Sequence, residues 1–92
     1  MQDAKALGRI VELVRDLRKR CPWDGAQTAE TLRPYLVEEV LELDHAIGAG
    51  DTRKVRDELG DVLLHLAFQI VLGEETGAYG AEDVVTAVEA KI

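Results

Sequence analysis

Three ionisable residues interrupt a long apolar segment near the middle of the sequence. The segment RDELGDVLLHLAFQIVL covers residues 56–72, and Glu58, Asp61 and His65 occur in it at steps of three and four. Because a helix turns by about 100° per residue, this spacing places all three, together with Lys54, in one narrow stripe. The residues on both sides of the stripe are apolar, so we expect it to face something other than bulk water.

A second acidic group comes earlier in the chain. Glu38, Glu39 and Glu42 lie at the edge of another stripe with helical spacing, which would face the core. The apolar residues of that stripe are Leu36, Val40, Leu43 and Ile47. Desolvating one carboxylate costs several kcal/mol, and neighbouring like charges add to that cost. A divalent cation is the simplest counter-charge, and ligands that are all oxygen atoms favour Mg²⁺ or Mn²⁺ over Zn²⁺.

The composition is that of one small globular domain. The chain has 92 residues, of which 47% are hydrophobic and 32% are charged, and its net charge is −7. The five carboxylates at positions 38, 39, 42, 58 and 61 carry most of this surplus, because the remaining net charge would be only −2. So acidic a chain is not expected to bind a nucleic-acid backbone directly. It can still hold phosphates through a bound cation.

Cellular placement is predicted from features that the sequence lacks. Cys21 is the only cysteine, which excludes an intrachain disulfide and favours a reducing compartment. The first residues have no signal-peptide layout, and no apolar run reaches the roughly 20 residues that span a bilayer. We therefore expect a soluble, cytoplasmic protein with no membrane partner.

Helical periodicity extends through the chain, and no alternating run of useful length indicates a strand. Helices are predicted at residues 3–20, about 32–47, 52–76 and 81–92. Pro22 and Gly25 break the pattern, so residues 21–27 are predicted to form a loop. Asp3 is expected to open the first helix and Thr28 or Thr31 to cap the second, with Pro34 in its first turn. The glycines expected to end helices are Gly48, Gly50 and Gly77. Short connections favour an all-α, four-helix bundle-like domain.

These motifs together resemble the MazG family of all-α nucleoside triphosphate pyrophosphohydrolases. CPWDGAQTAETLRPYLVEEVLEL (21–43) is similar to that family's loop and EExxE motif, and DELGDVLLHLAFQ (57–69) is similar to its ExxD motif. The resemblance covers roughly residues 5–90. It implies a domain that forms a dimer or a dimer of dimers and hydrolyses an NTP or dNTP to the monophosphate and pyrophosphate. Related members continue into a basic segment, so residues 1–92 could be a fragment or one half of a longer protein.

The resemblance also implies the ligands of a metal site, and the positions of neighbouring residues make them candidates for further roles. It implies a Mg²⁺ site made by Glu39, Glu42, Glu58 and Asp61, with Mn²⁺ as a substitute. Glu38 is a candidate to orient or deprotonate the attacking water, and its alternative role is that of a surface glutamate. Candidate substrate-binding residues are Lys54 for a phosphate, Trp23 for stacking on a nucleobase, and His65. For Trp23 and His65 the alternative is structural: packing of the loop onto the bundle, and a core histidine.

Three other interpretations stay open at this stage. One is a pyrophosphohydrolase specific for dUTP or another nucleotide on the same scaffold. Another is a di-iron bundle, which requires two Glu-x-x-His pairs; Glu42 with His45 has that spacing, but Glu58 is followed by Asp61. The third is a non-catalytic helical oligomerisation or regulatory module, in which the glutamates of residues 38–42 are merely a solvated face.

Overall fold

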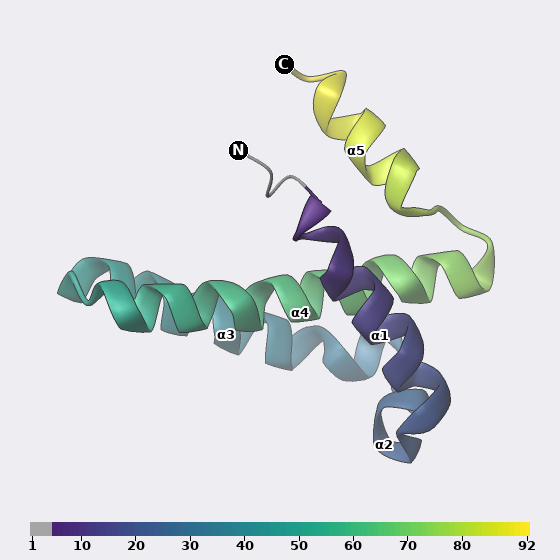
Figure 1. The fold of residues 1–92 in the computed structure, drawn as a ribbon, viewed down its shortest axis with the longest axis horizontal. Coiled ribbons are helices and arrows are strands. Elements are labelled where there is room, and N and C mark those ends of the chain that lie inside the picture. Colours follow the sequence, from purple (N-terminus) through teal and green to yellow (C-terminus); the bar gives the residue numbers. More distant parts are fainter. Residues whose placement is uncertain (1–4) are drawn as a thin grey trace.

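The computed structural model describes residues 5–92, and helices form most of this part of the chain (Figure 1). The helices are α1 (Gly8–Arg20), α2 (Pro22–Gly25), α3 (Ala29–Ala49), α4 (Thr52–Thr76) and α5 (Ala81–Glu89). Residues 5–92 contain no strand. The prediction of an all-α fold is therefore confirmed.

The longest helix, α4, has the predicted bounds because both of its ends are capped. At its start, the side chain of Asp51 accepts a hydrogen bond from the backbone N–H of Lys54 at 3.1 Å. At its end, Gly77 adopts a φ of +76°, a left-handed conformation that glycine tolerates best. The neighbouring helix α3 ends in the same way at Gly50, with a φ of +72°.

Helix α3 begins earlier than predicted, because Thr28 and Thr31 cap it together. Each threonine hydroxyl accepts a hydrogen bond from the other residue's backbone N–H, at 2.8 and 3.2 Å, so the helix starts at Ala29. Pro34 consequently lies in the second turn and not in the first. Both Pro34 and Glu30 are exposed, so water can reach the Glu30 carbonyl that loses its helical partner.

Three further boundaries differ from the sequence-based expectation. The α-helical part of α1 starts at Gly8, and the predicted start at residue 3 with its Asp3 cap lies outside the described residues. The predicted loop at 21–27 contains the one-turn helix α2, which Pro22 begins because its fixed φ suits the first helical position. The last helix ends at Glu89, before Ile92.

Helices α3 and α4 form a long antiparallel hairpin, and α1 packs across the C-terminal half of α4 (Figure 1). The buried hydrophobic residues of the core come from these three helices: Val14, Leu32, Ala67, Phe68, Val71 and Leu72. Leu64 is partly buried against them. Four of the six buried positions are on α4, so the predicted central place of this helix is confirmed.

Helix α5 projects away from the other three long helices (Figure 1). Its attachment lies just before its start, where the Tyr79 ring packs on Gly73 and the Tyr79 hydroxyl donates to the Gln69 carbonyl at 3.2 Å. All of its residues are at least partly exposed. Within one chain the packing is therefore that of three long helices with a projecting fourth. No helix in the described part of the chain is both long enough and apolar enough to cross a membrane.

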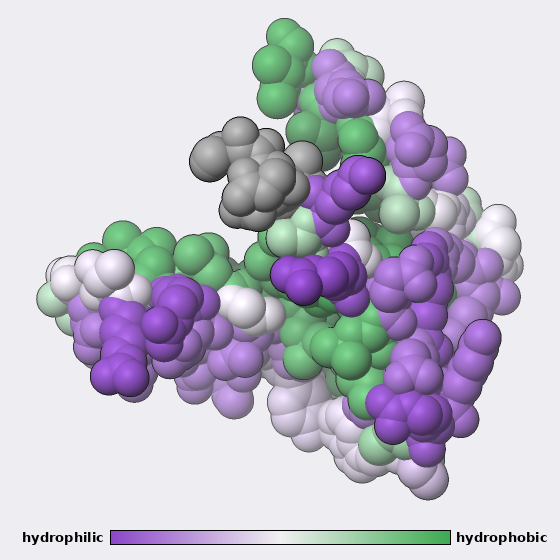
Figure 2. Space-filling view, in the orientation of Figure 1, coloured by the Kyte–Doolittle hydropathy of each residue, from purple (hydrophilic) through white to green (hydrophobic). Residues whose placement is uncertain are grey.

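The α3–α4 hairpin has two chemically different faces. Figure 2 shows hydrophobic residues along the upper edge of the arm that the hairpin forms and hydrophilic residues along the lower edge. Val40 and Ile47, which the sequence placed on a core-facing stripe, are 45% and 59% exposed in this single chain. That prediction is wrong for one copy, because the described chain provides no helix to cover this side of the hairpin.

Candidate metal centre

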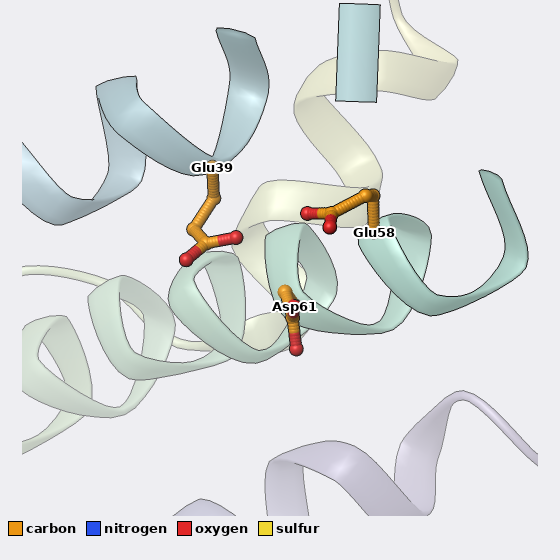
Figure 3. A group of neighbouring side chains, drawn as sticks. All are labelled: Glu39, Glu58 and Asp61. Carbon is orange, nitrogen blue, oxygen red and sulfur yellow. The ribbon is translucent and has the colours of Figure 1, made fainter. Parts of the chain in front are cut away.

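Three carboxylates from the two hairpin helices come together where α3 crosses α4. One ligand oxygen from each of Glu39, Glu58 and Asp61 lies within 4.8 Å of the others. Figure 3 shows Glu39 projecting from α3 toward α4, with the Glu58 carboxylate directed back toward it and Asp61 one turn further along α4. The two sequence motifs thus bring carboxylate oxygens close together, and the helical spacing indicated this for Glu58 and Asp61.

The three residues differ in their exposure to water. Glu58 is buried, with 8% of its surface exposed; Glu39 is half-buried; and Asp61 is exposed. Glu58 is buried because it lies on the side of α4 that faces α3, where Ala46 leaves room beside it. The centre is therefore closed by the two helices on its inner side and open to solvent at Asp61.

Two carboxylate oxygens at this centre lack a hydrogen-bond donor. Oε2 of Glu39 and Oε2 of Glu58 are each buried, and neither has a partner among the described residues. An ionised carboxylate that is buried without a partner is costly, and a cation between two such oxygens removes most of that cost. The residues present therefore fit a divalent ion. Because all the donors are carboxylate oxygens, they favour a hard ion such as Mg²⁺ or Mn²⁺.

The protonation behaviour of this centre has the same cause. Burial, together with the charges of Glu42, Asp61 and Glu58, raises the pKa of Glu39 from its ordinary value of 4.5 to about 7, and burial contributes most. Burial, followed by the charge of Glu42, also raises the pKa of Glu58. Without a counter-charge, the centre thus binds protons more tightly than ordinary carboxyl groups do.

The remaining acidic residues of the first motif lie at the solvent side. Glu42 is exposed, and its carboxylate is not one of the three that come together. Its charge nevertheless raises the pKa values of Glu39 and Glu58. Glu38 is exposed one turn before it. Both line a cavity of about 370 Å³ together with Glu58 and Lys54; its other lining residues are Leu41, His45 and Ala46. The cavity thus joins the buried carboxylates to solvent.

A row of aromatic rings runs toward the carboxylates from residues 21–27, which contain α2 and are called the α2 loop below. The Trp23 ring meets the Tyr35 ring edge to face, with centroids 6.4 Å apart. Tyr35 lies nearly parallel to His65, at 6.3 Å and 11°, and His65 in turn lies 6.4 Å from Phe68. His65 is one helical turn after Asp61 and is half-buried, with Nδ1 buried and unpaired within residues 5–92.

Sequence reasoning singled out Trp23 and His65 but missed Tyr35, which connects them. A signal was available, because Tyr35, Glu39 and Glu42 follow one another at steps of four and three on one side of α3. Trp23 and Tyr35 are both exposed, so this part of the row can be reached from solvent. The two expected roles of Trp23, packing of the loop and stacking on a ligand, are therefore compatible.

Comparison with known proteins links the chain to one enzyme family. Residues 27–92 match the model of the MazG nucleotide pyrophosphohydrolase domain. The chain is 40% identical, over 90% of its length, to the nucleoside triphosphate pyrophosphohydrolase/pyrophosphatase MazG of Thermotoga maritima. It is 35% identical over its whole length to the nucleoside triphosphate pyrophosphohydrolase of Escherichia coli K12, and 37% identical over 99% to that of Mycolicibacterium smegmatis. The chain spans 33%, 35% and 29% of these three proteins.

Proposed function

The chain belongs to the MazG nucleotide pyrophosphohydrolase family, and from this premise we propose that it hydrolyses nucleoside triphosphates or deoxynucleoside triphosphates to the monophosphate and pyrophosphate. The reaction requires Mg²⁺, for which Mn²⁺ can substitute. Related proteins of which this chain spans about a third carry names for this activity. The acidic centre of Glu39, Glu58 and Asp61 supports this proposal.

The observation that carries the proposal is the pair of buried oxygens on Glu39 and Glu58 that have no hydrogen-bond partner within residues 5–92. We propose that these residues and Asp61 hold the ion, with Glu42 completing the set from the solvent side. When bound, the ion neutralises charge on the phosphate oxygens and lowers the pKa of a nearby water. An acidic chain can in this way bind a polyanionic substrate that its own carboxylates would repel.

The other residues of the site act on the substrate directly. Lys54, which lines the same cavity as Glu38 and Glu42, places its positive charge beside a phosphate group. Glu38 faces the same cavity and orients the attacking water or takes its proton. Trp23 and Tyr35 offer exposed rings on which a nucleobase can stack, a contact that tolerates many bases. His65, whose ring lies nearly parallel to that of Tyr35, holds Tyr35 in place beside the substrate.

The proposal extends to the assembly. The exposed apolar residues on one side of the hairpin include Val40, Ile47, Leu59 and Leu66. The helical projection puts these residues on the side of α3 and α4 that turns away from Lys54 and Glu38. Two copies that pack these sides together form a four-helix core across a dimer and leave both acidic cavities open. A dimer of dimers is the larger alternative.

A panel of NTPs and dNTPs, incubated with the protein and Mg²⁺ and assayed for pyrophosphate, tests this function. We expect release of one pyrophosphate and one monophosphate per substrate, with no release in EDTA. Turnover of a single nucleotide such as dUTP would select the nucleotide-specific form of the proposal. Absence of turnover on the whole panel, together with no effect of Mg²⁺ on thermal stability, would instead support a non-catalytic helical module.

A further inference from the structure

The guanidinium group of Arg18 joins three separate parts of the chain. Its Nε and Nη2 donate to the two carboxylate oxygens of Glu75, at the C-terminal end of α4, at 3.0 and 2.5 Å. Its Nη1 donates to the backbone carbonyls of Asp24 and Gln27, each at 2.7 Å, and more weakly to that of Gly25 at 3.2 Å. One side chain of α1 thus ties the α2 loop to the end of α4.

The neighbouring pair on the same two helices does not make this connection. Arg15, one turn earlier on α1, also forms a bidentate pair, with Glu74 at 3.0 and 2.6 Å. Its remaining bond goes to Glu12 on its own helix. The exposed fraction of the Arg15 side chain is 39%, against 12% for Arg18. The two arginines are therefore matched as links between α1 and α4 and differ in their contact with the loop.

The loop that Arg18 holds is also fastened on its other side. The Gln27 side chain donates to the Trp23 carbonyl at 2.9 Å and accepts from the Thr31 hydroxyl at 2.9 Å. A Cβ at Gly25 would lie 2.8 Å from the Arg18 carbonyl oxygen, so α2 rests directly on the backbone of α1. These contacts fix the backbone of the loop between α1 and the start of α3.

The position of the loop decides where the Trp23 ring lies. Trp23 meets Tyr35, and Tyr35 stacks on His65, one turn beyond Asp61 of the metal centre. Both Trp23 and Tyr35 are exposed, so little besides the loop backbone holds the indole in place. A shift of the loop therefore moves the outer part of the aromatic row while the carboxylates stay on their rigid helices.

We propose that Arg18 is a positioning residue for the substrate. By donating hydrogen bonds to the backbone carbonyls of the α2 loop and pairing with Glu75, it holds Trp23 in the position where a nucleobase stacks on it. This inference rests on the proposed function. Arg18 acts through the loop and contacts neither the carboxylate centre nor the phosphates. Its removal should therefore weaken substrate binding and leave the chemical step nearly unchanged.

The test compares Arg18→Gln with Arg15→Gln, which loses an equivalent pair but no loop contact. Trp23 is the only tryptophan, so its fluorescence reports the loop alone. For Arg18→Gln we expect stronger acrylamide quenching of Trp23 and a KM raised about 3- to 10-fold, with kcat within about 2-fold of wild type. For Arg15→Gln we expect wild-type quenching and KM, even where its melting temperature falls equally.

A second variant keeps the test decisive if Arg18→Gln does not fold. Arg18→Lys retains the charge but cannot pair bidentately with Glu75 and also reach two carbonyls, so it should still show the raised KM and the quenching. Equal KM values for the Arg18 and Arg15 variants of an active wild type would overturn the positioning role. A wild type without pyrophosphate release would instead overturn the proposed function, and the quenching comparison would still report on the loop.

Discussion

Glu39 of α3 and Glu58 of α4 face each other across the hairpin, and each holds one buried carboxylate oxygen without a hydrogen-bond partner in the described chain. Two such oxygens close together are unfavourable when both groups are ionised. A bound cation relieves this repulsion, and so does a proton. The expected outcomes for metal, pH and charge-removing substitutions all follow from this relationship.

Removing a charge from the centre should abolish activity while stabilising the metal-free fold. Glu58→Gln keeps the shape of the side chain but removes a buried ligand, so pyrophosphate release should fall by at least about 100-fold. In EDTA at neutral pH its melting temperature should rise, because a like-charge contact is lost. Glu89→Gln, an equal change in charge at an exposed site on α5, is the control and should leave both measurements unchanged. Full activity in Glu58→Gln would remove Glu58 from the site.

Divalent cations should stabilise the folded protein without any nucleotide. A ligand present at 100 times its dissociation constant adds about 2.7 kcal/mol to the free energy of unfolding. For a domain of this size, this corresponds to a rise of roughly 10 °C or more in melting temperature. Thermal melts across a Mg²⁺ titration measure the shift, and Glu58→Gln should reduce it strongly. A wild-type shift no larger than that of Glu58→Gln would argue against the centre as an ion site.

The metal-free protein should become less stable as the pH rises from about 4.5 to about 7. The pKa of Glu39 is raised from 4.5 to about 7 in the folded state, mainly by burial. Between these values the folded protein holds more protons than the unfolded chain, so the free energy of unfolding falls with increasing pH. Denaturant melts in EDTA at several pH values measure this slope.

One variant and one ion separate the titration of Glu39 from that of other groups. Glu39→Gln should flatten the slope, and saturating Mg²⁺ should remove it, because the ion replaces the proton. Glu74 and Glu75 act at a different pH, since the arginines that pair with them lower their pKa values below 4.5. Their stabilising effect is lost only in more acidic solution. A slope unchanged in Glu39→Gln would assign the titration to another group.

The parts of the site that lie within single helices could be predicted from the sequence. Glu58 and Asp61 share a stripe because their spacing is helical. The apolar residues beside the stripe indicated that it avoids bulk water, which is correct for the buried Glu58 and wrong for the exposed Asp61 and Lys54. The ends of α4 followed from Asp51 and Gly77, whose preferences are local. The burial of each carboxylate could not be predicted in the same way. Glu42 shares a motif with Glu39 but is exposed, which depends on how α3 is rotated against α4.

Features that depend on contacts distant in sequence were missed. The contact of Arg18 with Glu75 joins residues 57 apart in the chain, and no periodicity indicates it. Val40 and Ile47 were assigned to a core stripe because they are apolar at helical spacing, yet they are exposed in one copy. A pattern of apolar residues shows that a face avoids water, but it does not show whether the same chain covers it.

That exposed face gives the last prediction. Leu59→Glu places a charge among the apolar residues on the side of the hairpin away from the cavity, so it should convert the proposed dimer to a monomer. Sedimentation velocity or light scattering during gel filtration measures the mass. Val85→Glu is the control: this residue is also an exposed apolar side chain, but it lies on the projecting helix α5, and the substitution should leave the mass of the dimer unchanged.

The same variant shows whether assembly matters for folding. A three-helix packing with one bare side buries little apolar surface, and a domain of 92 residues has a small margin of stability. Leu59→Glu should therefore lower the melting temperature, and the wild-type melting temperature should rise with protein concentration because dimerisation stabilises only the folded chain. A wild type that is monomeric at all concentrations, with a melting temperature independent of concentration, would contradict an interface on this face.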